Sequence, residues 1–196
     1  MSEPTTEQKK PSWEQLFEIA NGQEGYFTAV QAREAGYSPQ LLAHHLRGGK
    51  FERELRGVYR LVHYPLSGHG DRIALWLWSD QKGVFSHESA LMMHRLSDVL
   101  PEKMHLTLPK SWTRRRVKIP SHVVPYFADI PESDRTWIGS VPVTTPERTI
   151  ADCAESRVSP EFVRQAINEM RKRGMFPNDL IYQAVKYLHD FEEGRL

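Results

Sequence analysis

The segment Tyr37–Leu61, YSPQLLAHHLRGGKFERELRGVYRL, constrains the fold more than any other part of the sequence. Ser38-Pro39 is typical of a helix start, because a serine side chain caps free amide groups and proline suits the first helical position. Gly48-Gly49 ends that helix. The two runs that follow, KFEREL and GVYRL, alternate around Arg56-Gly57 as the strands of a β-hairpin do. The segment therefore predicts a helix that leads directly into a hairpin.

Two further helical patterns precede this segment. Apolar residues recur at helical spacing from Trp13 to Ala20, with Ser12 as the capping residue, and Thr28 precedes a second run, AVQAREAG. Three short helices followed by a hairpin is the element order of a winged helix-turn-helix, whose second and third helices meet through a tight, glycine-containing turn. We therefore expect a winged-helix domain over residues 11–64, with residues 1–10 as a disordered tail.

Polar and cationic side chains cluster on the third helix and the hairpin. In a winged helix bound to DNA, the third helix enters the major groove and the hairpin, or wing, follows the flanking backbone. By the helical period, Gln40, His44 and Arg47 share the face opposite the leucines, and we expect them to read base edges. The cations expected to contact phosphates are Lys50, Arg53, Arg56 and Arg60. A winged helix that binds proteins and carries solvated charges is the alternative.

The second half of the chain has a different character. The stretch HYPLSGHG predicts a joint, and an apolar helix, DRIALWLWSD, follows it. Next come a strand and a Ser86-capped helix in GVFSHESALMMHRL, a strand in KMHLTLP, a strand pair or bent strand in RRRVKIPSHVVPYFADI, and one more strand in TWIGSVPVTT. Three amphipathic helices close the chain. We therefore expect an α+β protein in which a small mixed α/β domain with C-terminal helices occupies residues 70–196.

A second basic cluster lies in KSWTRRRVKI, which contains no acidic residue. Its tryptophan either stacks on a base or packs against the sheet. The cluster is therefore either a patch for nucleic acid or an acidic partner, or a solvated loop tip. Its members are Lys110, Trp112, Arg114, Arg115, Arg116 and Lys118.

Composition excludes several classes of protein. The chain has 26 basic and 25 acidic residues and a net charge of +1, so a role with nucleic acid must rest on local clusters. The single cysteine, Cys153, excludes an internal disulfide framework and is expected in the core. The first residues lack the apolar region of a secretory signal, and the longest apolar run, IALWLW, is too short to span a bilayer. We therefore expect a cytoplasmic protein with no membrane partner.

The polar motifs do not match those of an enzyme, and we expect no catalytic residues, metal or cofactor. His44 and His45 are adjacent and point in different directions on a helix, and His87 and His94 lack the one-turn spacing of a zincin. No G-x-S-x-G elbow or phosphate-binding glycine loop occurs. An enzyme that processes nucleic acid through Arg114–Arg116 is the weakest hypothesis.

The stretch GYFTAVQAREAGYSPQLLAHHLRGGKFERELRGVYRL resembles the N-terminal winged-helix domain of the AbiEi-type antitoxin family of type IV toxin–antitoxin systems. The aromatic YFT, the glycine that ends the second helix, Ser38 and the closing RGVYRL carry the resemblance. FSHESALMMHRLSDVLPEKMHLTLP, an arginine-rich turn and VPVTTPERTIADCAE extend it, so that it covers about Trp13 to Glu155.

The resemblance implies a transcriptional autorepressor that binds inverted repeats in its own promoter as double-stranded DNA. It also implies a C-terminal domain that opposes a nucleotidyltransferase toxin encoded nearby. A protein-interaction module or adaptor, with a winged helix that does not bind DNA, remains the alternative function. The operator sequence, the oligomeric state and the identity of the toxin stay open.

Overall fold

The computed structural model describes residues 10–175 and 179–195. The tail predicted for residues 1–10 lies outside these ranges except for its last residue, Lys10, which is exposed. The chain divides into two compact units after Gln81. Both units contain helices and strands, which confirms the predicted α+β class. Among the described residues, no helix combines the length and the apolar character that crossing a bilayer requires.

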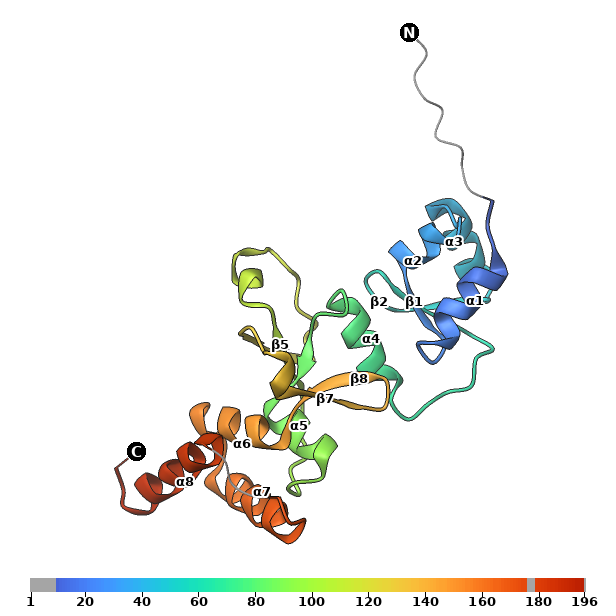
Figure 1. Ribbon diagram of the computed structural model, residues 1–196. Helices are drawn as coiled ribbons and strands as arrows, with labels where there is room; N and C mark the ends of the chain where they lie inside the picture. The colour runs from blue at the N-terminus through green and yellow to red at the C-terminus, as the bar shows by residue number, and fades with distance from the viewer. Residues whose placement is uncertain (1–9, 176–178, 196) are drawn as a thin grey trace. The chain divides into compact units, whose positions relative to one another are not determined.

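The first unit contains a winged helix-turn-helix (Figure 1). Its first three helices and its strands follow the order α1 (Trp13–Asn21), β1 (Tyr26–Thr28), α2 (Ala29–Glu34), α3 (Pro39–Arg47), β2 (Phe51–Leu55) and β3 (Val58–Leu61). β3 lies at the centre of an antiparallel sheet, between β1 and β2. The sequence YFT forms β1 and therefore supplies the third strand of the wing sheet.

The predicted caps explain where the three helices begin. Ser12, Thr28 and Ser38 each accept a hydrogen bond from the backbone amide three residues further on, at 3.1–3.2 Å. The Gln31 side chain also accepts a hydrogen bond from the Thr28 amide at 2.8 Å, which completes a capping box. One face of the sheet packs on these helices. The buried apolar core there consists of Leu16, Ala20, Phe27, Ala32, Ala35, Tyr37, Leu42, Phe51 and Leu61.

A fourth helix, α4 (Gly70–Trp78), completes the first unit by packing against all three strands. Side chains alternate across a strand, so Tyr26 points to the face opposite Phe27 and meets α4 there. The contact is close: a Cβ atom on Gly70 would lie 2.1 Å from the Tyr26 phenol oxygen. The division between the units thus falls after Gln81, whereas the sequence places the joint before this helix.

The second unit is built on a five-stranded mixed sheet with the order β6–β5–β4–β8–β7. The strands are β4 (Val84–Phe85), β5 (Met104–Leu108), β6 (Val123–Phe127), β7 (Arg135–Ile138) and β8 (Val141–Thr144). The pairs β4–β8 and β5–β6 are parallel, and β4–β5 and β7–β8 are antiparallel. TWIGSVPVTT was expected to add one strand and contributes two, because Gly139, with φ of 60°, allows the chain to reverse between β7 and β8.

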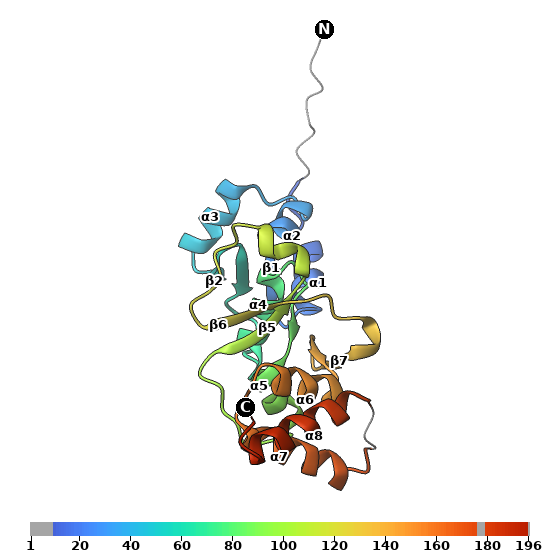
Figure 2. The same cartoon turned by 90° about the vertical axis from the view of Figure 1, so that its left-hand side faces the viewer.

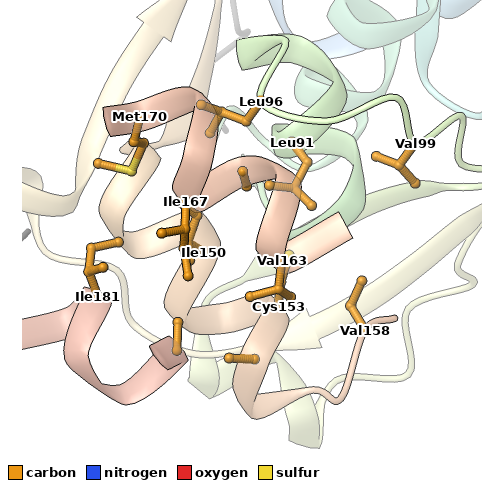
Figure 3. Close-up of a cluster of buried hydrophobic side chains, with 13 residues drawn as sticks. Leu91, Leu96, Val99, Ile150, Cys153, Val158, Val163, Ile167, Met170 and Ile181 are labelled. Carbon is orange, nitrogen blue, oxygen red and sulfur yellow. The ribbon is translucent and has the colours of Figure 1, made fainter. Parts of the chain in front are cut away.

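Four helices lie together on one side of this sheet (Figures 1 and 2). They are α5 (His87–His94), α6 (Pro146–Glu155), α7 (Pro160–Lys172) and α8 (Asp179–Glu192), and two short 3₁₀ helices, η1 (Lys110–Arg114) and η2 (Glu132–Asp134), lie in the loops. α6 contacts the other three helices and contributes Ile150 and Cys153 to their shared apolar core (Figure 3). Cys153 is fully buried, so it is a core residue, as expected.

Candidate nucleic-acid interface

Helix α3 presents the three predicted base-reading residues on one exposed face. Gln40, His44 and Arg47 follow one another at spacings of four and three residues, and all three are exposed to solvent. Leu42 is buried in the core on the other face. Amide and guanidinium groups form the paired hydrogen bonds that distinguish bases in the major groove. The helix therefore offers side chains of suitable chemistry along its outer face.

The wing carries three exposed cations beside this helix. Lys50 directly precedes β2, Arg53 lies within it, and Arg56 occupies the turn, where Gly57 adopts φ of 82°. Within the part of the chain that the structure describes, no carboxylate forms an ion pair with any of these three cations. Arg53 makes one long hydrogen bond, 3.4 Å, to the Leu55 carbonyl. These cations are therefore accessible to an external anion.

Arg60 is placed differently from the other cations of the wing. Its Nε lies 3.0 Å from Glu54 Oε1 and its Nη2 2.5 Å from Glu52 Oε2, and 13% of the side chain is exposed. The cause is the register of β2 and β3, which pairs Arg60 with Glu52 on one face and Arg53 with Tyr59 on the other. Burial lowers the pKa of Arg60, but the hydrogen bonds to Glu54 and Glu52 outweigh burial and the pKa is raised. Of the four cations expected to contact phosphates, Arg60 therefore differs from the others, because carboxylates already bind its guanidinium group.

In the second basic cluster the cations are exposed, whereas the tryptophan is buried. Trp112, in η1, is 4% exposed, and the guanidinium carbon of Arg115 lies 4.9 Å from the centre of its ring. Of the two roles that the sequence allows for this tryptophan, the structure selects packing. The cations of the cluster, all with solvent access, are Lys110, Arg114, Arg115, Arg116 and Lys118.

A buried polar network in the second unit was not predicted from the sequence. Its centre is His87, whose Nδ1 lies 2.9 Å from Ser86 Oγ and whose Nε2 lies 3.0 Å from Ser156 Oγ. The imidazole stacks on the Tyr126 ring with centroids 3.5 Å apart. Burial, followed by the charge of His105, lowers the pKa of His87 to about 3. This imidazole is therefore neutral near pH 7, and with such a pKa it is a poor general base.

The network continues through a second histidine. His105 Nδ1 lies 3.3 Å from the Tyr126 hydroxyl, and its Nε2 lies 3.5 Å from a Glu88 carboxylate oxygen. Across residues 10–175 and 179–195, no three His, Cys, Asp or Glu side chains are arranged to hold a metal ion. The signal in the sequence was the alternation of KMHLTLP, which directs His105 and Thr107 to one face of β5. That both faces of β5 are buried could not be inferred from the alternation.

The first unit is similar in sequence to a known protein family. Residues 14–62 match the sequence model of the family described as "Transcriptional regulator, AbiEi antitoxin". No curated protein matches the chain. Among solved structures, the chain resembles the crystal structure of the RV2827C protein from Mycobacterium tuberculosis, with 16% identity and a TM-score of 0.51 over 93% of this chain and 78% of that chain. At this identity the likeness concerns the fold alone. The resemblance to AbiEi-type antitoxins that the sequence motifs indicate is therefore confirmed, over the winged helix-turn-helix of this chain.

Proposed function

We propose that this protein is a cytoplasmic, DNA-binding transcriptional repressor that acts as the antitoxin of a type IV toxin–antitoxin system. The observation that carries the proposal is the adjacency of two accessible features in one winged helix. α3 presents Gln40, His44 and Arg47 to solvent, and the neighbouring wing exposes three cations without ion-pair partners among the described residues. The match of residues 14–62 to a family of transcriptional regulators supports the same function.

In the proposed complex, the wing and α3 contact different parts of the DNA. Lys50, Arg53 and Arg56 contact phosphates and fix the position of the domain on the duplex. The polar side chains of α3 then reach base edges in the major groove. Arg60 is left out of the phosphate-contacting set, because Glu52 and Glu54 already bind its guanidinium group.

The salt dependence of DNA binding tests this division. Three phosphate contacts per bound chain predict a slope of roughly −2.7 in a plot of log affinity against log salt concentration. A rise from 50 to 200 mM salt should therefore weaken binding about 40-fold. Fluorescence anisotropy with a labelled duplex from the promoter of its own gene gives this slope. Absent binding, or binding insensitive to salt, contradicts the proposal.

Sequence preference is tested with one substitution on α3. Arg47→Ala should lower affinity for the promoter duplex about tenfold and relax the preference at one base-pair position. Its affinity for a random duplex should change much less. An equal loss on both duplexes would assign Arg47 to phosphate contacts instead.

For the second unit, we propose the antitoxin role, with a nucleotidyltransferase toxin encoded nearby as the partner. Co-expression of the intact protein with such a neighbour should restore the growth that the toxin alone arrests. Substitution of Arg114 and Arg116 by glutamine, which removes two exposed cations of the second basic cluster, tests whether that cluster contributes to neutralisation. Capture of the toxin without any DNA binding would favour the protein-interaction module over the repressor.

A further inference from the structure

The first unit contains an aromatic pocket that the proposed DNA contacts share only at Lys50. It has a volume of about 700 Å³, within the usual range for sites of small molecules. α1 provides Trp13 and Phe17 at the rim, where they are 53% and 41% exposed. Tyr37, Phe51 and Leu61 form the floor and are buried. The pocket is therefore open to solvent on one side and closed by the domain core on the other.

Contacts around the pocket hold one of its walls in place. The Tyr64 hydroxyl donates a hydrogen bond of 2.9 Å to Asn21 Oδ1. On its other side the Tyr64 ring lies against Gly25, where a Cβ atom would stand 2.6 Å from the ring. Gly25 has φ of 90°, so glycine serves both the turn and the close approach of the ring. A preformed aromatic wall reduces the entropy lost when a ligand binds.

The polar groups that line the pocket favour a negatively charged ligand. Lys50 is the cation, and the imidazoles of His45 and His63 also line the pocket, whereas none of the described residues that line it is acidic. The centre of the His45 ring lies 5.0 Å from the centre of the Phe51 ring and 5.7 Å from that of the Tyr37 ring. An aromatic body fits the apolar lining, and an acidic group on it would be attracted to the ammonium group of Lys50.

We infer that this pocket binds a small aromatic anion, such as an aromatic carboxylate, and that the bound anion releases the protein from DNA. The link to release rests on the proposed function, in which Lys50 contacts a phosphate. A carboxylate held at Lys50 neutralises that cation and competes with the phosphate for it. The pocket thus gives the repressor an inducer site that shares one residue with the DNA interface.

Two probes that differ in charge test the pocket in the intact protein. Isothermal titration calorimetry with 1-naphthoate, an anion, and 1-naphthalenemethanol, its neutral counterpart, measures both affinities without DNA. Naphthoate should bind at least tenfold more tightly. Lys50→Met keeps the aliphatic stem and should remove this advantage, while Trp13→Ala should weaken both probes several-fold. Lys103→Met, which removes an exposed lysine of the second unit, is the matched control and should change neither affinity.

The outcomes separate this inference from the proposed function. Naphthoate at saturation should lower the affinity for the promoter duplex several-fold in the wild type and less than twofold in Lys50→Met. If neither probe binds, or if both bind the wild type equally, the pocket assignment is wrong even where DNA binding is normal. If naphthoate binds as expected and no duplex binds, the pocket stands and the DNA function fails. If the wild type is a dimer that binds neither probe, and Trp13→Ala is a monomer, this face is an interface between copies and the inference is overturned.

Discussion

The second unit buries more of its polar side chains than the first unit does. The first unit buries an apolar core under α1–α3 and leaves its wing cations Lys50, Arg53 and Arg56 exposed to solvent. The second unit has an apolar helical core of its own but also buries imidazole, hydroxyl and carboxylate groups between its sheet and helices. Burying a polar group is costly unless it is hydrogen-bonded, and an exposed cation costs little until a ligand desolvates it. Stability is therefore coupled to protonation mainly in the second unit, whereas the cations proposed to contact DNA lie in the first.

The largest effect expected from this difference is an acid-induced loss of stability that is greater in the second unit than in the first. Burial lowers the pKa of His87 to about 3 and also lowers the pKa values of His94 and His105. Between pH 6.5 and pH 3 these histidines therefore bind more protons in the unfolded chain than in the folded one, so their contribution to stability falls as the pH falls. His87 alone should cost roughly 1.4 kcal/mol for each pH unit below 6.5.

Native-state hydrogen exchange at pH 6.5 and pH 5, corrected for the intrinsic exchange rates, measures this loss separately in each unit. Peptides from α6 should lose protection, whereas peptides from α1 should lose much less. His87→Gln should flatten the pH dependence of the α6 peptides, because glutamine does not titrate. Equal losses in both units would remove the proposed contrast.

A loss of comparable size is expected when the partly buried ion pairs of Arg148 in the second unit are broken. Arg148 Nε lies 2.7 Å from Asp152 Oδ1, and Nη1 lies 3.0 Å from Asp134 Oδ2. The side chain of Asp152 is 8% exposed, so Arg148→Met leaves a poorly solvated carboxylate. We expect a loss of about 2–3 kcal/mol in the free energy of unfolding, measured by urea denaturation. The double substitution Arg148→Met, Asp152→Asn should recover part of it; no recovery would mean that the loss comes from packing.

Steric crowding against α4 provides the corresponding test of the first unit. Gly70→Ala places a methyl group against the Tyr26 phenol and should destabilise this unit by about 1–3 kcal/mol. A methyl group on Gly68 would meet no heavy atom of the described residues within 4 Å, so Gly68→Ala is the matched control. It should stay within about 0.5 kcal/mol of the wild type. Hydrogen exchange in β1 measures both variants. Equal effects would mean that α4 does not support the wing sheet.

The smallest expected effect is a change in affinity for DNA, and it should differ between Arg53 and Arg60, which lie on opposite faces of the wing. Arg53→Gln should reduce affinity for DNA about fivefold and make the salt slope less steep by about 0.9, because one phosphate contact is lost. Arg60→Gln should change affinity less than twofold, since Arg60 is already paired with Glu52 and Glu54. Anisotropy titrations at several salt concentrations measure both variants. A larger loss for Arg60 would contradict the assignment of faces.

Local patterns predicted the helices of the winged helix and their exposed face. Ser12, Thr28 and Ser38 cap helices through bonds to residues three positions away, and such contacts depend on little beyond the local chain. Likewise, Gln40 and His44 share a face because the helical period alone sets their spacing. The reversal at Gly57 between β2 and β3 also follows from neighbouring residues.

Residues with similar local patterns have different environments where neighbouring strands or distant segments contact them. Arg60 and Arg53 both lie in the hairpin, but strand register gave one of them two carboxylate partners. His87 is embedded by Ser156, which is far away in the sequence, and α4 joins the first unit by packing on its sheet. The amino-acid order thus sets elements whose interactions span a few residues. Which charges are neutralised, and which histidines are desolvated, depends on segments brought together by folding, since burial and pairing arise from neighbours in space rather than along the chain.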